Sequence, residues 1–202
     1  MKKYLILKRV FDIIIAYIFL LFSYLPMTII ALIIKISDGG PVIFKQIRIG
    51  LDSRPFVCYK FRTMSVNAPS DISTKEFKNA KKYVTKFGAF LRRTSLDELP
   101  QLLNVLAGDM SLIGPRPLIP NEKYVHSMRK RLGVYRIRPG ISGLAQVSGR
   151  DELDDNLKIE CDAMYADNIS FATDLGIALK TLLNVFKRVG ICDKEESAVD
   201  TR

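Results

Sequence analysis

Apolar and polar positions separate most sharply near the N-terminus, where residues 13–34 form a run of 22 positions without a charged side chain. As a helix this run would be about 33 Å long, enough to cross the hydrocarbon core of a bilayer. Basic residues precede the run at Lys8 and Arg9 and follow it at Lys35. The pattern predicts a helix that contacts lipid.

Three topologies compete for this segment. A cleaved signal peptide fits poorly, because the run is longer than a usual signal core and no small-residue cleavage site follows it. A spanning helix kinked at Pro26 satisfies the length requirement. A re-entrant helix that breaks at Ser23 and Pro26 and returns to the same face also accounts for basic residues at both ends, because the positive-inside rule keeps both ends cytoplasmic. The last two topologies stay open on this pattern.

The rest of the chain alternates between short apolar runs and stretches with helical periodicity. The runs interpreted as strands are residues 42–44 and 56–59, which form a hairpin, and residues 143–147. Apolar positions at helical spacing predict further helices over 78–93, 95–108 and 170–189. Ser95 and Glu98 have capping-box spacing at the start of the middle helix. These elements predict a mostly helical fold of the α/β (α+β) class.

Composition and charge narrow the possible partners. The 202 residues are 48% hydrophobic and 26% charged, so the chain is not a disordered polyampholyte. The net charge of +10 comes from the middle of the chain, where residues 35–150 carry 21 basic and 8 acidic side chains. Such a block suits phosphate groups, anionic lipid or nucleic acid, although a solubilising surface would have the same charge. Three scattered cysteines and one histidine, His126, argue against a structural zinc site.

The adjacent acids Asp97 and Glu98 could do more than cap a helix. Acids at a helix start commonly cap the helix. Alternatively, with Arg92 nearby, one ionised carboxylate could attack a phosphorus atom while the other holds a metal ion. The residues alone leave both uses open.

Further charged residues stand at rigid or isolated positions. Arg116 lies between two prolines and Arg138 precedes a Pro-Gly turn, so each is either a fixed phosphate-binding guanidinium or an exposed turn residue. Asp162 and Asp174 are candidate metal ligands or arginine partners, although isolated acids are more often solvated.

Six short motifs occur in a fixed order along the chain. They are Lys8-Arg9-Val10-Phe11-Asp12, Lys60-Phe61-Arg62-Thr63-Met64, Ser95-Leu96-Asp97-Glu98-Leu99-Pro100-Gln101, Gly108-Asp109-Met110-Ser111, Gly114-Pro115-Arg116-Pro117 and Arg138-Pro139-Gly140-Ile141-Ser142-Gly143. Together they resemble the bacterial sugar transferase family, in its small monotopic form of polyprenol-phosphate phosphoglycosyl transferase.

The resemblance implies an organisation and an activity. Residues 1–36 would form the membrane-inserted re-entrant helix, residues 37–190 a compact catalytic domain with interfacial amphipathic helices, and residues 191–202 a flexible tail. The enzyme would lie on the cytoplasmic face of the inner membrane, in contact with membrane lipid. There it would move a sugar 1-phosphate from a UDP-sugar to undecaprenyl phosphate, release UMP and so start a surface glycan. The sugar and the oligomeric state stay open.

The resemblance also implies roles for individual residues. Asp97 corresponds to the nucleophile that forms an aspartyl-phosphosugar intermediate, and Glu98 completes an Asp-Glu dyad that binds Mg²⁺. The residues that correspond to phosphate-binding positions are Arg92, Arg116 and Arg138, while Asp162 and Asp174 are weaker metal candidates. The competing hypothesis is a membrane-tethered, non-enzymatic binder of anionic lipid or nucleic acid. No nucleic-acid-binding motif supports its nucleic-acid form, and it leaves the dyad unexplained.

Overall fold

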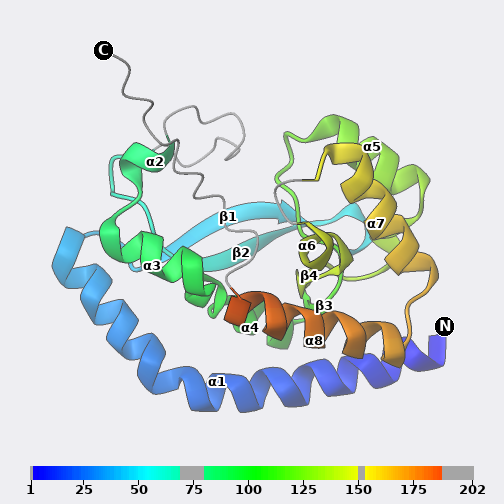
Figure 1. The fold of residues 1–202 in the computed structure, drawn as a ribbon, viewed down its shortest axis with the longest axis horizontal. Coiled ribbons are helices and arrows are strands. Elements are labelled where there is room, and N and C mark those ends of the chain that lie inside the picture. The colour runs from blue at the N-terminus through cyan, green and yellow to red at the C-terminus, as the bar shows by residue number, and fades with distance from the viewer. Residues whose placement is uncertain (1, 69–79, 150–152, 188–202) are drawn as a thin grey trace.

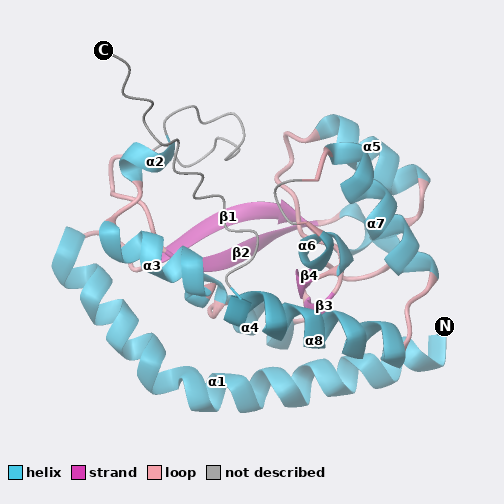
Figure 2. Ribbon diagram, viewed as in Figure 1, coloured by secondary structure: helices cyan, strands magenta, loops and turns pink. Residues whose placement is uncertain are grey.

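Helix α1, Lys2–Asp38, is the longest element, and the remaining elements fold against it (Figure 1). The computed structural model describes residues 2–68, 80–149 and 153–187. In those ranges the other helices are α2 (Ala80–Tyr83), α3 (Lys86–Thr94), α4 (Gln101–Ala107), α5 (Lys123–Arg131), α6 (Leu144–Ser148), α7 (Asp155–Asp167) and α8 (Phe171–Lys187). The strands are β1 (Ile43–Ile49), β2 (Pro55–Phe61), β3 (Ser111–Ile113) and β4 (Gly140–Ser142), and the 3-10 turns are η1 (Leu51–Ser53), η2 (Leu96–Glu98) and η3 (Val134–Arg136). Helices dominate, as expected for the mostly helical α+β class (Figure 2).

Two small sheets organise the strands. Strands β1 and β2 pair antiparallel from Ile43 opposite Phe61 to Ile49 opposite Pro55, which confirms the hairpin and lengthens both of its strands. Strands β3 and β4 pair in parallel. Gly140 is required there, because a Cβ atom at this position would lie 2.1 Å from the backbone nitrogen of Gly114. This close approach fixes the loop after β3 against β4.

The helix expected over residues 95–108 is divided in the structure. Ser95 adopts a left-handed conformation (φ +57°), ends α3 and makes no side-chain capping bond, so the capping box is wrong. Turn η2 follows, and α4 starts only after Pro100. The physical reason is that proline has no N–H to donate and is tolerated at a helix start.

Two further expectations change. The predicted strand over 143–147 is wrong, because these residues enter helix α6, and the strand is β4, just before it. The helix expected over 78–93 is interrupted at Thr85, whose Oγ accepts a hydrogen bond from the Gly88 N–H (2.9 Å) and caps α3. Residues 78, 79, 188, 189 and 191–202 lie outside the described ranges.

Helix α1 bends but does not break. The predicted interruption at Ser23 and Pro26 is absent, since helical structure continues through both residues. Proline inside a helix removes one backbone hydrogen bond and favours a bend. Figure 1 shows α1 running beneath the other elements and then turning up along one side. Among the described residues, α1 has the length and apolar composition needed to cross a membrane.

One side of α1 is buried against the domain along most of its length. Ala16 packs with buried residues of β2 and α4, and Ile30 and Ile34 pack with Phe61 and Leu91. The rest of its surface is apolar and exposed; the exposed side chains include Ile6, Leu7, Val10, Phe11, Ile14, Tyr17, Phe19, Leu21, Phe22, Tyr24, Leu25, Leu32 and Ile36. Exposed apolar side chains also line α8, at Phe171, Leu175, Leu179, Leu182 and Leu183. The rings of Phe11 and Phe171, 6.4 Å apart, join the two surfaces, and a patch of this size indicates contact with lipid or another apolar partner.

Buried polar side chains attach the start of α1 to the domain. Lys8 lies 2.9 Å from Asp174 of α8 and 3.6 Å from Asp12, whose other oxygen accepts a bond from the Ser111 hydroxyl at 2.7 Å. Arg9 donates to the carbonyl oxygens of Val105 and Leu106 at the end of α4, where a cation also complements the helix dipole. The first motif of the chain is therefore an attachment between α1, α4 and α8.

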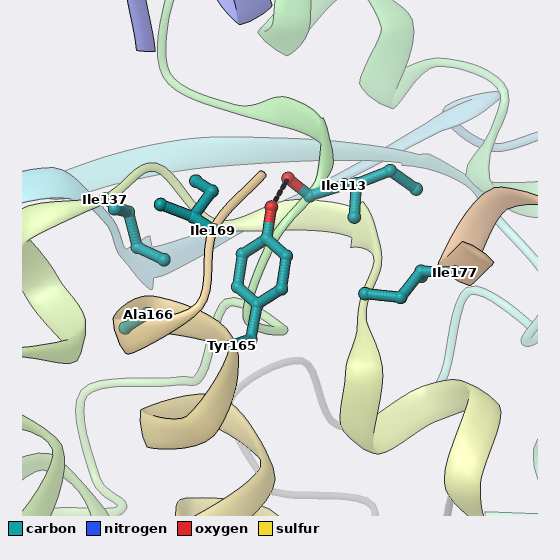
Figure 3. Close-up of a cluster of buried hydrophobic side chains, with 6 residues drawn as sticks. All are labelled: Ile113, Ile137, Tyr165, Ala166, Ile169 and Ile177. Carbon is teal, nitrogen blue, oxygen red and sulfur yellow. Dashed lines mark hydrogen bonds between the residues drawn. The ribbon is translucent and has the colours of Figure 1, made fainter. Parts of the chain in front are cut away.

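Asp174 connects this attachment to a hydrophobic cluster. Its two carboxylate oxygens accept hydrogen bonds of 2.6 Å from the Tyr4 and Tyr165 hydroxyls. Tyr165 is buried among isoleucines, and its hydroxyl also lies 3.2 Å from the Ile113 carbonyl oxygen (Figure 3).

We predict that Asp174→Ala lowers the free energy of unfolding by about 3 kcal/mol, because the buried Lys8 ammonium loses its nearer carboxylate and keeps only Asp12 at 3.6 Å, and the Tyr4 and Tyr165 hydroxyls lose their acceptor. Thermal unfolding in detergent measures the loss. Asp167→Ala is the matched control, since Asp167 has a 65% exposed side chain and forms a surface pair with Arg136; its loss should stay below about 1 kcal/mol. Equal, small losses for both variants would contradict this role of Asp174.

Candidate active site

The dyad occupies turn η2 between α3 and α4. Ser95 ends α3 in a left-handed conformation, and Asp97 in the turn that follows is only 8% exposed. Glu98 lines a shallow cleft that is open to solvent. The cleft-lining residues are Arg48, Cys58, Lys60, Glu98, Gln101, Arg116, Pro117, Gly140 and Ile141. They come from β1, β2, η2, α4, β4 and the loop after β3, so the cleft forms only in the folded domain.

Glu98 is held by two cations from distant parts of the chain. Its Oε1 lies 2.6 Å from Lys60 Nζ on β2 and 3.7 Å from an Arg116 guanidinium nitrogen on the loop after β3. Such charge-assisted contacts favour the ionised carboxylate. Glu98 therefore keeps two cations, Lys60 and Arg116, next to Asp97.

Burial and the neighbouring charges shift the pKa of Asp97 in opposite directions. Burial is the largest effect and raises the pKa of Asp97, and the negative charge of Glu98 raises it further. Lys60, Arg92 and Arg116 lower the pKa, which is about 6 as the net result. At neutral pH the carboxylate is thus mostly ionised but poorly hydrated, which is the state that a nucleophile needs.

The three predicted phosphate-binding arginines separate into two groups. Arg116 lines the cleft, and Arg92 interacts electrostatically with Asp97 while its Nε donates to the Thr63 hydroxyl at 2.8 Å. Burial lowers the pKa of Arg92, and Asp97 opposes that effect. Arg138 is not among the cleft-lining residues; its Nε donates to the Gly108 carbonyl at 2.8 Å. The structure brings together Asp97, Glu98, Arg92 and Arg116, and gives Arg138 a backbone partner at the end of α4.

The weaker metal candidates also have protein partners. Asp162 is paired with Arg129, which confirms the arginine-partner interpretation for this residue, and Asp174 is bound by Lys8 and two tyrosines. Neither lines the cleft, and the described residues contain no group of three or more His, Cys, Asp or Glu side chains that could hold a metal ion.

Several cleft residues carry little or no signal in the sequence. Lys60 is visible there only as the first residue of a short motif, and nothing local indicates that it pairs with Glu98, 38 positions later. Gln101 is likewise visible only as the last residue of a motif, and Arg48 has no signal of its own. Arg48 donates to the Pro117 carbonyl at 3.0 Å, and burial lowers its pKa, as does neighbouring Arg116.

The fold and the cleft define a membrane-associated protein with a paired-acid, multi-cation site. The chain belongs to the bacterial sugar transferase family, whose pattern it matches over residues 3–188. It is 40% identical over 189 residues to the uncharacterized sugar transferase EpsL of Bacillus subtilis (strain 168), covering 93% of this chain and 91% of that protein.

Two longer relatives have more specific names. The chain is 41% identical to the UDP-glucose:undecaprenyl-phosphate glucose-1-phosphate transferase of Escherichia coli (strain K12), covering 90% of this chain and 40% of that protein. It is 38% identical to the undecaprenyl-phosphate galactose phosphotransferase of Salmonella typhimurium (strain LT2), covering 91% and 41%. The chain thus spans less than half of these two relatives.

We predict that Asp97→Asn stabilises the protein above pH 6. The pKa of about 6 in the folded state exceeds the ordinary value of 3.8, so ionisation of Asp97 destabilises the fold as pH rises from about 4 to about 6. Removing that charge should add about 1–3 kcal/mol at pH 8. Thermal unfolding between pH 4 and pH 8 measures the effect, which should shrink towards pH 4.

The control for this prediction is Glu160→Gln, because Glu160 is an exposed acid on α7. Its substitution should leave the pH profile of stability unchanged. A less stable Asp97→Asn protein at pH 8 would contradict the prediction, since it would show that the ionised carboxylate stabilises the fold.

Proposed function

We propose that the protein transfers a sugar 1-phosphate from a UDP-sugar to undecaprenyl phosphate, releasing UMP, through a covalent intermediate on Asp97. The observation that carries the proposal is the burial of Asp97 beside Glu98 within reach of Lys60, Arg92 and Arg116. The names of the two longer relatives support the same substrates. They differ in the sugar, so the proposal leaves its identity open.

In the first step an Asp97 carboxylate oxygen attacks the phosphorus that bears the sugar. The bond between this phosphorus and the bridging oxygen breaks, and UMP leaves with the electron pair. Arg92, Arg116 and Lys60 neutralise the phosphoryl oxygens, and burial removes water that would otherwise shield the carboxylate.

In the second step an oxygen of undecaprenyl phosphate attacks the same phosphorus. The aspartyl oxygen leaves with the electron pair, which regenerates the Asp97 carboxylate and forms a diphosphate-linked lipid sugar. Covalent capture allows the polar donor and the lipid acceptor to use one cleft in turn.

The dyad also suits a magnesium ion. Mg²⁺ commonly takes one or two protein carboxylates and completes its ligands with water and substrate phosphates, so two adjacent acids next to a cleft fit it. Glu98, with Asp97, would hold the ion, which would offset the negative charge of the diphosphate when bound. Lys60 and Arg116 contact Glu98 Oε1 and would orient the carboxylate beside the ion.

The apolar surfaces of α1 and α8 support a site at a membrane, and the proposed substrates place it on the cytoplasmic face of the inner membrane. Near its start α1 contacts α4 and α8 through Arg9 and Lys8, and near its end Ile30 and Ile34 contact the same domain. Contact of both ends of α1 with one domain supports the re-entrant topology over the spanning one.

We predict that Asp97→Asn lowers UMP release from UDP-sugars at least about 10³-fold, because an amide cannot form the aspartyl-phosphosugar bond. Glu98→Gln should lower kcat strongly as well, since it loosens Lys60 and weakens the ion site. A panel of UDP-sugars with undecaprenyl phosphate in detergent measures release, and Glu160→Gln is the control expected to keep full activity.

Undiminished turnover by Asp97→Asn would rule out Asp97 as the nucleophile. Wild-type protein that binds anionic vesicles but turns over none of the UDP-sugars would favour the competing hypothesis of a non-enzymatic lipid binder.

We also predict that single cysteines replacing Lys3 and Ser37 react with a membrane-impermeant maleimide only from the cytoplasmic side, in a background whose native cysteines are replaced by serine. These two positions lie near opposite ends of α1. Labelling of one end from each side of the membrane would instead establish a spanning helix.

A further inference from the structure

The loop that carries Arg116 is held by its backbone carbonyls. Four consecutive carbonyl oxygens, from Pro115 to Leu118, each accept a hydrogen bond from another part of the chain. The donors, in order, are the Gly140 N–H (2.9 Å), the Arg129 guanidinium (2.8 Å), the Arg48 guanidinium (3.0 Å) and the Ile49 N–H (2.9 Å). Two donors are backbone groups of strands and one is the side chain of Arg48, which lines the cleft, whereas Arg129 comes from helix α5.

Arg129 is a buried cation that contacts Tyr135 and bonds to two further partners. Its side chain is 3% exposed; one terminal nitrogen donates to the Arg116 carbonyl and the other to Asp162 on α7, which is 1% exposed. Only a forked guanidinium can make both bonds from one rigid plane. Asp162 thus holds the Arg129 guanidinium, which in turn holds the Arg116 backbone.

Fold stability alone does not account for this pair. Burying two charges costs several kcal/mol per ion, and well-packed apolar residues often replace such a pair without loss of stability. The pair reaches the cleft-lining residues through the Arg116 carbonyl. The Arg116 side chain itself is 46% exposed and reaches Glu98 at 3.7 Å, so the direction of its backbone decides where its charge lies.

We propose that Arg129, held by Asp162, is a positioning residue that fixes the Arg116 backbone so that the Arg116 guanidinium meets the phosphates of the donor beside the dyad. The proposal rests on the proposed function for its substrate. It also gives Asp162 a role other than metal binding.

The test replaces both members of the pair with apolar residues, as Arg129→Met combined with Asp162→Leu. This variant leaves no unpaired buried charge, so its unfolding temperature should stay near that of the wild type. The bond to the Arg116 carbonyl is lost, and kcat/KM for the UDP-sugar should fall about tenfold, mostly through KM.

The matched control makes the same replacements in the neighbouring pair of η3 and α7, as Arg136→Met combined with Asp167→Leu. Arg136 bonds to Asp167 and to the Ala166 carbonyl, away from the Arg116 loop. This control should keep KM within about twofold of the wild-type value.

A double-mutant cycle with Arg116→Ala separates positioning from general disturbance. If Arg129 acts through Arg116, removing the Arg129–Asp162 pair in the Arg116→Ala background should change kcat/KM by less than about twofold. A further tenfold loss in that background would overturn the proposal, as would an unchanged KM in the folded Arg129→Met/Asp162→Leu variant.

Arg129→Lys provides the second variant, because it keeps a charge for Asp162 but lacks the fork, and it should show the same rise in KM. Loss of folding in both this variant and the apolar pair would reduce the pair to a structural element and would also overturn the proposal.

Hydrogen exchange tests the same idea without substrate. The backbone amides of Ile49 and Gly140 donate to the Arg116 loop. In the apolar-pair variant they should exchange at least about tenfold faster than in the wild type, and in the control variant their exchange rates should stay at the wild-type values. Unchanged exchange in the apolar-pair variant would overturn the positioning role. Wild-type protein without UDP-sugar turnover would overturn the proposed function alone, since this measurement would still decide whether Arg129 fixes the loop.

Discussion

The burial of one carboxylate among several cations is the constraint on which the rest of the structure depends. Asp97 is nearly inaccessible, so its ionised form loses hydration, and its pKa is raised to about 6. Lys60, Arg92 and Arg116 limit that rise, while Glu98 next to it holds two of these cations in place. The result is a carboxylate that is mostly charged at neutral pH, weakly hydrated and surrounded by cations. Because the pKa of Asp97 is raised, its ionisation lowers the free energy of unfolding. Such a perturbed pKa is typical of a functional carboxylate.

The surrounding elements place this site in a domain that is attached to an apolar helix. Turn η2 contains the dyad, strand β2 contains Lys60, and the loop after β3 contains Arg116. The Arg116 carbonyl accepts a hydrogen bond from Arg129 on α5, which is paired with Asp162 on α7. Lys8, Arg9 and Asp12 join the start of α1 to α4, β3 and α8. A helix with a wide exposed apolar side is therefore attached rigidly to the domain that contains the cleft. This arrangement suits a reaction in which one substrate is water-soluble and the other is a membrane lipid.

The sequence pattern predicted what depends on local periodicity and missed what depends on distant pairing. The apolar N-terminal helix, the hairpin and helix α8 follow from spacing alone. The capping box at Ser95 failed because a left-handed residue and Pro100 split the expected helix, and the strand at 143–147 failed because short apolar runs also suit helices. The pairs Lys60–Glu98 and Arg129–Asp162 join residues more than 30 positions apart, so no local signal could have identified them.

The most direct test of covalent catalysis by Asp97 is the mass of the protein after incubation with its UDP-sugar donor and Mg²⁺, without the lipid acceptor. A covalent intermediate predicts one UMP released per protein molecule and a sugar-phosphate adduct on the peptide that contains Asp97. An adduct on another residue, or UMP release that requires the lipid acceptor and leaves no adduct, would contradict it.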